Sequence, residues 1–217
     1  MENSDPYGEL REKMVAGQII PRGITDRNVI AAMLAVERHL FVPESMKDYA
    51  YRDEALPLGG GQTISQPYIV AVMTELLRVK RSDKILEIGT GSGYQAAVLS
   101  LLCESVYSIE QDPALAASAA KLLARLGYKN IIIKTGDGYL GWAEFAPYDK
   151  IIFTCAPPGV PEKLAGQLKE GGLITGPVGP AGFTQELIIG KKTGSRLEIE
   201  SVMPVSFVPM LKGEEDV

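Results

Sequence analysis

From residue 84 onward, short apolar runs alternate with helical patterns, and this alternation leaves few possible folds. The apolar runs cover residues 84–88, 105–109, 130–134, 148–154 and 172–177. Helical patterns lie between them, at about 94–102, 113–126 and 161–169. The runs are continuously apolar, as in strands that are covered on both faces. We therefore predict an α/β fold with a mostly parallel, doubly wound sheet.

The two ends of the chain depart from this alternation. Strand patterns at about 185–191 and 196–203, joined by Lys192–Ser195, predict a C-terminal antiparallel hairpin at the sheet edge. Before residue 81 we expect helices at 7–18, 25–38 and 67–78, with a loop-rich stretch at 44–64. We predict a single domain, residues 1–217, in which residues 1–80 supply N-terminal helices and a loop, and residues 81–217 form the α/β core.

Composition excludes several classes of protein. The 217 residues are 46% hydrophobic and 23% charged, which is ordinary for a soluble globular protein. The net charge is -5 and no basic stripe is visible, so we expect no nucleic acid partner. No apolar run is long enough to cross a membrane, and Met1–Asp5 is too polar for a signal peptide. We expect a cytoplasmic monomer with a solvated acidic tail at 213–217.

Metal-binding residue types are scarce. His39 is the sole histidine, and Cys103 and Cys155 lie far apart without metal-type spacing. We predict no metal site, two buried cysteines that behave as small apolar residues, and a structural role for His39.

A glycine loop, Glu87-Ile-Gly89-Thr-Gly91-Ser-Gly93, lies where the first strand of the core meets its helix. Glycine there allows a sharp turn and lets a ligand approach the backbone. A dinucleotide fingerprint needs its third glycine at position 94, which is Tyr94, so a nicotinamide-dependent dehydrogenase is disfavoured. The Gly-Lys-Ser/Thr of a phosphate-binding Walker loop is absent.

Three acidic residues follow the strand ends near this loop. Glu87 precedes the loop, which suits a ligand with a positive amino group, such as S-adenosyl-L-methionine. Glu110 ends the second strand, where a carboxylate can accept hydrogen bonds from the ribose hydroxyls. Asp137 follows the third strand, where its carboxylate could accept hydrogen bonds from the exocyclic amine of a base. Each alone could be a solvated loop residue, but together they predict S-adenosyl-L-methionine as cofactor and S-adenosyl-L-homocysteine as product.

Several segments resemble the protein-L-isoaspartate O-methyltransferases, in the same order along nearly the whole chain. They are Arg38–Pro43, Gln62–Pro67, Leu86–Tyr94, Gly136–Gly138 and Phe207–Pro209. The glycine loop is common to many methyltransferases, whereas Gln-Thr-Ile-Ser-x-Pro is much more specific. The resemblance implies a Rossmann-like methyltransferase fold. It also implies methyl transfer to the free α-carboxylate of L-isoaspartyl residues in damaged peptides and proteins, which starts their repair.

The resemblance also implies roles for particular residues. Ser65 matches the active-site serine. The implied cofactor contacts are Glu87, Gly89, Thr90, Gly91, Gly93, Glu110, Gln111, Asp137 and Gly138. The implied acceptor contacts are Gln62, Thr63, Ile64, Ser65, Gln66, Pro67 and Val208. The sequence departs from the family at Tyr68, where some members have histidine, and it stops soon after Met210, where some have a longer tail.

The acceptor segment also has a local interpretation. Ser65 lies just before Pro67, where we expect it to cap the following helix. Gly59–Gly61 would let the preceding loop fold tightly over a ligand. A carboxylate acceptor is already ionised at neutral pH, so we expect Ser65 to orient it rather than to act as a nucleophile.

Other functions remain open at this point. The same fold could methylate a different carboxylate, a small molecule, an RNA base or another protein side chain. The run Thr154-Cys-Ala-Pro-Pro-Gly159 lacks the amide and aromatic residues of an amine-methylating motif. A non-catalytic cofactor-binding module would not need the intact Gln62–Pro67 segment.

Overall fold

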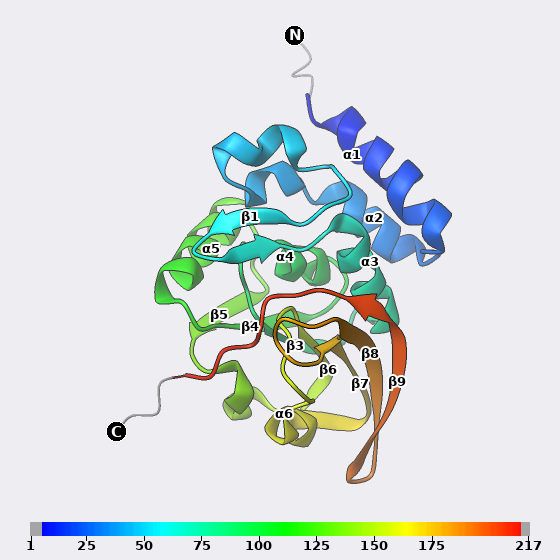
Figure 1. The fold of residues 1–217 in the computed structure, drawn as a ribbon, viewed down its shortest axis with the longest axis vertical. Helices are drawn as coiled ribbons and strands as arrows, with labels where there is room; N and C mark the ends of the chain where they lie inside the picture. Colours follow the sequence, from blue (N-terminus) through cyan, green and yellow to red (C-terminus); the bar gives the residue numbers. More distant parts are fainter. Residues whose placement is uncertain (1–5, 214–217) are drawn as a thin grey trace.

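A computed structural model describes residues 6–213 (Figure 1). The N-terminal residues considered for a signal peptide, and the acidic residues after Gly213, lie outside the described residues. The strands of the main sheet are β3 (Lys84–Ile88), β4 (Ser105–Glu110), β5 (Ile131–Thr135), β6 (Tyr148–Phe153), β7 (Leu168–Val178), β8 (Gln185–Thr193) and β9 (Arg196–Val205). Their order across the sheet is β5-β4-β3-β6-β7-β8-β9.

The strand directions confirm the predicted sheet. Strands β3 to β7 pair in parallel, and β8 and β9 pair antiparallel at one edge. The chain passes from β3 to β4 and β5 on one side, and then returns to place β6 on the other side of β3. This reversal makes the carboxyl end of β3 the point where open α/β sheets bind ligands.

Helices and helical turns connect the strands. They are α1 (Gly8–Met14), η1 (Val15–Ile19), η2 (Ile20–Arg22), α2 (Arg27–Ala35), η3 (Arg38–Phe41), η4 (Glu44–Tyr49), α3 (Pro67–Leu76), α4 (Tyr94–Ser100), α5 (Pro113–Arg125), η5 (Gly138–Leu140), η6 (Ala143–Phe145) and α6 (Glu162–Gln167). Figure 1 shows α1 to α3 grouped above the sheet, next to α4.

The alternation along β3 explains the two hydrophobic clusters. Ile85 belongs to the larger cluster, which includes apolar residues of α2, α3 and α4. Leu86 and Ile88 belong to the smaller one, which includes Leu164 of α6 and Met210 near the C-terminus. Successive strand residues point to opposite faces, so Glu87 lies on the face of Ile85. The N-terminal helices and the α/β core therefore share one continuous apolar cluster.

The loop-rich stretch 44–64 contains elements that the sequence analysis missed. Leu56–Gly59 (β1) and Gln62–Ile64 (β2) form a separate antiparallel pair. Gly59, Gly60 and Gly61 all have positive φ, at 98°, 59° and 77°. These glycines therefore make the turn of a hairpin, because L-residues rarely adopt three such conformations in succession.

Several predicted helix boundaries were wrong. The α-helical part of the first helix ends at Met14 and continues as a π-helical turn, and the second ends at Ala35 rather than 38. The predicted helix 161–169 ends at Gln167, because the chain becomes extended at Leu168 and enters β7. The other predicted strands and helices are confirmed within a few residues.

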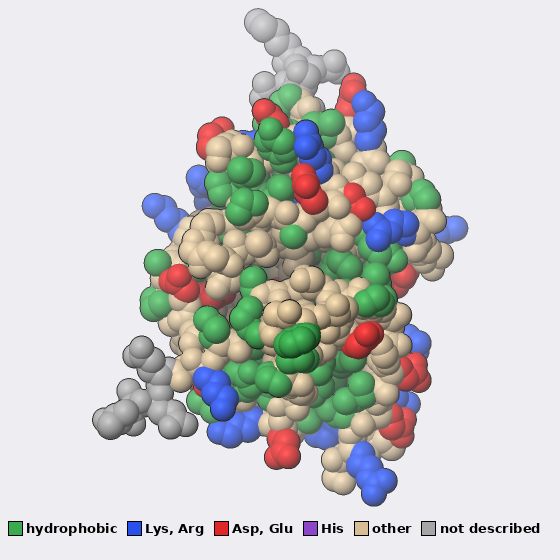
Figure 2. All heavy atoms as spheres, viewed as in Figure 1, with side chains coloured by type: hydrophobic (Ala, Val, Ile, Leu, Met, Phe, Trp, Pro, Cys, Tyr) green, Lys and Arg blue, Asp and Glu red, His purple; other side chains and the backbone are tan. Residues whose placement is uncertain are grey.

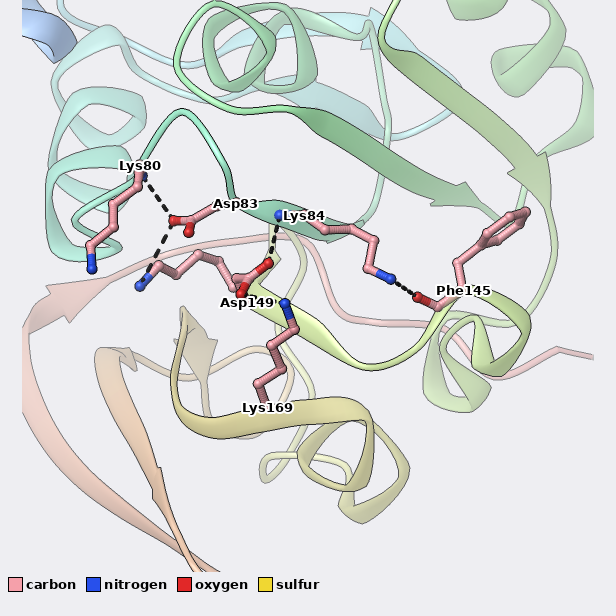
Figure 3. Close-up of polar contacts among 7 residues, drawn as sticks. Lys80, Asp83, Lys84, Phe145, Asp149 and Lys169 are labelled. Atoms are coloured by element: carbon pink, nitrogen blue, oxygen red, sulfur yellow. Dashed lines mark hydrogen bonds and ion pairs between the residues drawn. The ribbon is translucent and has the colours of Figure 1, made fainter.

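Charged side chains at the amino ends of β3, β6 and β7 are paired with one another (Figure 3). Asp149 accepts hydrogen bonds from the Lys84 amide (2.8 Å) and from Lys169 Nζ (2.6 Å). Lys150 Nζ lies 4.0 Å from Asp83 Oδ2, and both side chains are buried. This network lies at the edge opposite the carboxyl end of β3, and it links neighbouring strands.

Within residues 6–213, none of the helices is long and apolar enough to cross a membrane. The same residues hold no group of three or more His, Cys, Asp or Glu side chains arranged for a metal ion.

Candidate active site

A cavity of about 290 Å³ lies at the carboxyl ends of the parallel strands. Each of β3, β4 and β6 contributes the residues at or just after its end, and the segment after β5 contributes Gly138. The lining residues are Gly60, Gln62, Thr63, Ile88, Gly89, Gly91, Ile109, Glu110, Gln111, Asp112, Gly138, Thr154, Cys155, Val208, Pro209, Met210 and Leu211. The predicted cofactor and acceptor residues in this set therefore do meet at one site.

The glycine loop is held in place by backbone hydrogen bonds. Gly89 N donates to Ile109 O (2.8 Å), and Thr154 Oγ1 donates to Gly89 O (2.6 Å). A Cβ atom at Gly89 would lie 2.5 Å from Thr154 Oγ1, and the Gly89 φ is 93°. Both the close approach and the backbone conformation require glycine at this position.

Glu110 fixes the next part of the loop. Its Oε2 accepts a hydrogen bond from the Gly91 backbone N–H (2.8 Å), and its Oε1 accepts one from the Asp112 backbone N–H (3.1 Å). Each carboxylate oxygen has lone pairs beyond these bonds. Glu110 therefore supports the loop and still presents acceptors to the cavity, as expected for a residue that binds ribose hydroxyls.

Glu87 lies behind the loop and is not in the cavity lining. Its side chain is fully buried and accepts a hydrogen bond from Ser108 Oγ, which lies 2.6 Å from Thr90 Oγ1. Burial raises the Glu87 pKa to about 8. The nearby Glu110 also raises this pKa, whereas the hydrogen bond from Ser108 lowers it. Glu87 is thus linked to Thr90 of the loop through the Ser108 hydroxyl.

The remaining cofactor residues fall into two groups. Gly138 lines the cavity, and a Cβ there would collide with Ile88 and Met210. Asp137 does not line it; its Oδ1 accepts the Tyr139 amide (2.8 Å) and caps η5. Gly93 also lies outside the lining and begins α4 with φ 87°, packed against α5.

The acceptor segment meets the glycine loop at a second, smaller cavity of about 30 Å³. Its lining residues are Thr63, Ile64, Ser65, Val70, Gly89, Thr90, Gly91, Ser92, Tyr94, Gln95 and Thr154. A groove of about 280 Å³ on the other side of Ser65 includes Thr63, Gln66 and the end of β9. Ser65 therefore lies between this groove and the glycine loop.

The predicted helix cap at Ser65 was wrong. The N-cap of α3 is Gln66, whose side chain makes no capping bond, and Pro67 is the buried first residue of the helix. The Ser65 hydroxyl makes no hydrogen bond within residues 6–213. The reason is geometric: α3 begins at Pro67, as predicted, so the cap position falls on Gln66 and Ser65 remains in the segment before it.

An ion pair and a stacked ring flank the acceptor segment. The Arg22 guanidinium lies 3.4 Å from the centre of the Tyr68 ring and pairs with Asp53 Oδ2 at 2.7 Å. Gln66 Nε2 donates to Asp53 O (3.0 Å). Tyr68, where some family members have histidine, thus ties the start of α3 to the N-terminal region.

The chain after β9 crosses the cavity. Met210 N donates to Ala156 O (2.9 Å), Tyr139 Oη donates to Met210 O (3.2 Å), and Gln111 Nε2 donates to Lys212 O (2.7 Å). This segment and the β1–β2 hairpin lie on the same face, and Figure 2 shows the surface hollowed between them. Val208, predicted from the resemblance, belongs to this segment.

Two residues that line the cavity were not predicted from the sequence. Thr154 and Cys155 follow β6, so the rule that ligands bind at strand ends could have identified them. Cys155 is partly exposed and lines the cavity, so the prediction that both cysteines are buried was wrong for this one. His39 is buried, stacks on Tyr7 at 4.0 Å between ring centres, and does not line the cavity.

Comparisons with known proteins identify the family to which the chain is similar. The family model for Protein-L-isoaspartate(D-aspartate) O-methyltransferase (PCMT) matches residues 10–215. A "Protein-L-isoaspartate O-methyltransferase" of Synechococcus sp. (strain JA-2-3B'a(2-13)) is 53% identical, over 96% of this chain and 88% of that protein. One of Opitutus terrae is 53% identical, over 93% of this chain and 87% of that protein.

Solved structures show the same fold. A protein-L-isoaspartate O-methyltransferase has a TM-score of 0.84 and 32% identity; the match covers 92% of this chain and 65% of that chain. A beta-aspartate methyltransferase (PCMT) from Plasmodium falciparum, solved in complex with S-adenosyl-L-homocysteine, has a TM-score of 0.78 and 24% identity. That match covers 95% of this chain and 99% of the other. This chain belongs to the protein-L-isoaspartate(D-aspartate) O-methyltransferase family.

Proposed function

We propose that this protein transfers a methyl group from S-adenosyl-L-methionine to the free α-carboxylate of L-isoaspartyl residues in damaged peptides and proteins, which initiates their repair. The main support is the position of Ser65. Its hydroxyl lies between an open groove and the glycine-loop cavity, and it has no hydrogen bond within residues 6–213. A hydroxyl at this place can hold a carboxylate that arrives through the groove.

The proposed chemistry is an in-line displacement. When bound, the cofactor supplies an electrophilic methyl group on a positively charged sulfur. A carboxylate oxygen forms the new bond to the methyl carbon, and the electron pair of the breaking carbon–sulfur bond stays on sulfur. Ser65 donates a hydrogen bond to the acceptor carboxylate and so fixes its direction of approach. Alignment of the two reacting atoms is then the main source of rate enhancement.

No general base is needed for this reaction. An α-carboxyl group has a pKa of about 3.5, so the acceptor is ionised at neutral pH. His39, the sole histidine, is buried away from the cavity lining. The residues at the site therefore need to bind and orient, and none has to move a proton.

The remaining predicted residues have proposed roles that follow their positions. Glu110 accepts the ribose hydroxyls, and Gly138 and Asp137 adjoin the adenine. The backbone of Gly89, Thr90 and Gly91 lines the methionine end, with Gly93 starting the helix behind it. Gln111 borders the ribose. The proposed acceptor contacts are Gln62, Thr63, Ile64, Gln66, Pro67 and Val208.

We further propose that residues 1–217 form one methyltransferase domain that acts as a cytoplasmic monomer without nucleic acid. The shared apolar cluster of the N-terminal helices and the core supports the single domain.

Paired peptides test the proposed function. Two synthetic peptides of identical sequence, one with L-isoaspartate and one with ordinary L-aspartate, are incubated with the protein and methyl-labelled cofactor. We expect base-labile label in the isoaspartyl peptide and almost none in its partner. Equal labelling of both peptides, or labelling of neither, would contradict the assignment and favour another acceptor.

A further inference from the structure

Gln95 lines the small cavity between Ser65 and the glycine loop, and neither the predicted site nor the proposed roles include it. It is the second residue of α4, and its side chain is only 6% exposed. Ser65, Gly89 and Thr154 lie around the same cavity of about 30 Å³. A space of this size admits a group as small as one or two water molecules, but not an adenosine.

The hydrogen bonds around Gln95 fix the orientation of its amide. Thr74 Oγ1 donates its single proton to Val70 O (2.7 Å). Thr74 can therefore only accept from Gln95, whose Nε2 lies 3.0 Å from Thr74 Oγ1. The amide nitrogen must point to Thr74, so the amide oxygen is the atom left over. This assignment follows from the hydrogen bond that the Thr74 hydroxyl donates to Val70 O.

The leftover oxygen lacks a partner. Within residues 6–213, Gln95 Oε1 is buried without a hydrogen bond, and so is Oε1 of Glu87, whose other oxygen accepts from Ser108. Native proteins rarely leave buried acceptors unpaired, so such an atom marks a place where a donor binds. Neither cavity has a lysine or arginine in its described lining, so a cationic donor to this oxygen would come from a bound molecule.

The charges near the site favour a cation. Glu110 lines the larger cavity, and Gly91 lines both cavities, so the two spaces meet at the glycine loop. Glu87 lies behind that loop. The methionine end of S-adenosyl-L-methionine carries an ammonium group with three hydrogen-bond donors. An amide oxygen can accept a hydrogen bond from this ammonium group and would complement the acidic side chain of Glu110.

We propose that Gln95 Oε1 accepts a hydrogen bond from the ammonium group of the cofactor's methionine end, and that Gln95 determines specificity for this group. The inference rests on the proposed use of S-adenosyl-L-methionine and adds a contact for it. Thr74 is the positioning residue, because its hydroxyl accepts from the amide nitrogen and so leaves the amide oxygen as the free acceptor. Gln95 thus distinguishes a cofactor with an ammonium group from one without it.

Calorimetry with two ligands tests the contact without measuring activity. The ligands are S-adenosyl-L-homocysteine and its desamino analogue, in which hydrogen replaces the ammonium group. We expect the wild-type protein to bind the desamino analogue at least about tenfold more weakly, since hydrogen bonds to charged groups are worth that much. In Gln95→Leu the ratio of the two dissociation constants should fall by about tenfold. An unchanged ratio, with both ligands weakened equally, would overturn the proposal.

A matched pair of variants at Thr74 keeps the test decisive if Gln95→Leu does not fold. Thr74→Ser keeps the hydroxyl that accepts from Gln95, and it should keep the wild-type ratio. Thr74→Val removes that acceptor and lets the amide turn, so its ratio should fall toward that of Gln95→Leu. Equal ratios in the two Thr74 variants would contradict the proposal. Wild-type protein that bound neither ligand would instead contradict the proposed function.

Discussion

At the scale of single residues, Glu87 shows how burial changes the role of an acid. The sequence suggested a carboxylate that faces the cofactor, but the side chain is fully buried and bonded to Ser108. Burial, with Glu110 nearby, raises its pKa to about 8, so the Glu87 carboxyl is mostly protonated at neutral pH. A neutral Glu87 can support the glycine loop through Ser108 and Thr90 without repelling Glu110.

This raised pKa predicts a pH dependence of stability. The unfolded chain releases the Glu87 proton near pH 4.5, whereas the folded chain keeps it until about pH 8. Between these values the folded state binds more protons, so the free energy of unfolding falls as pH rises. Above about pH 8 both states are ionised at this group and the decrease stops.

Urea unfolding of Glu87→Gln from pH 5 to pH 9 measures the effect. Glutamine cannot ionise, so relative to this variant the wild-type protein should lose stability up to about pH 8 and then level off. Glu104→Gln, at an exposed position, is the matched control and should show no such trend. A difference between wild type and Glu87→Gln that stays constant with pH would contradict the account.

At the scale of elements, one end of the parallel strands forms the cavity and the other end carries stabilising ion pairs. The carboxyl ends of β3, β4 and β6 supply the cavity, while the amino ends of β3, β6 and β7 carry paired charges (Figure 3). Asp149 on β6 joins the Lys84 amide on β3 to Lys169 on β7. Burial alone would raise the Asp149 pKa, but the hydrogen bonds from Lys169 and Lys84 outweigh it and lower the pKa.

Asp149→Asn should therefore destabilise the protein without affecting the site. We expect a loss of about 1 kcal/mol at neutral pH, because a charge-assisted bond becomes a neutral one. A lowered pKa gives stability that is present above the unfolded pKa and is lost as pH falls through the folded pKa. Thermal unfolding should thus show the variant and the wild type converging in acid. Asp48→Asn, an exposed position, is the control. A weaker affinity for S-adenosyl-L-homocysteine would contradict the purely structural role.

At the scale of the whole molecule, the parts that were predictable are those set by local patterns. The strands of the core are continuously apolar, and the glycine loop has few alternatives, so both were read correctly. The β1–β2 hairpin was missed because its three-residue second strand is too short to show a pattern. The positions of Glu87 and Gln95 depend on which face of the sheet or helix is covered, and that depends on packing between distant segments.

The acceptor site was likewise only partly predictable from the sequence. The sequence predicted that Gln62–Pro67 and the glycine loop act together, and the structure brings them to one cavity. It could not predict whether Ser65 caps its own helix, because that depends on which of Ser65 and Gln66 takes the N-cap position. The structure has Gln66 as the N-cap and leaves the Ser65 hydroxyl between the groove and the cavity.

The most direct test of this account compares Ser65→Ala with the wild type in two measurements on the same preparation. Calorimetry gives the affinity for S-adenosyl-L-homocysteine, and single-turnover methyl transfer to an isoaspartyl peptide gives the rate of the chemical step. We predict an affinity within about twofold of the wild type and a rate lower by about a hundredfold or more, as for loss of a group that aligns reactants. A methylation rate close to that of the wild type would contradict the central role of Ser65.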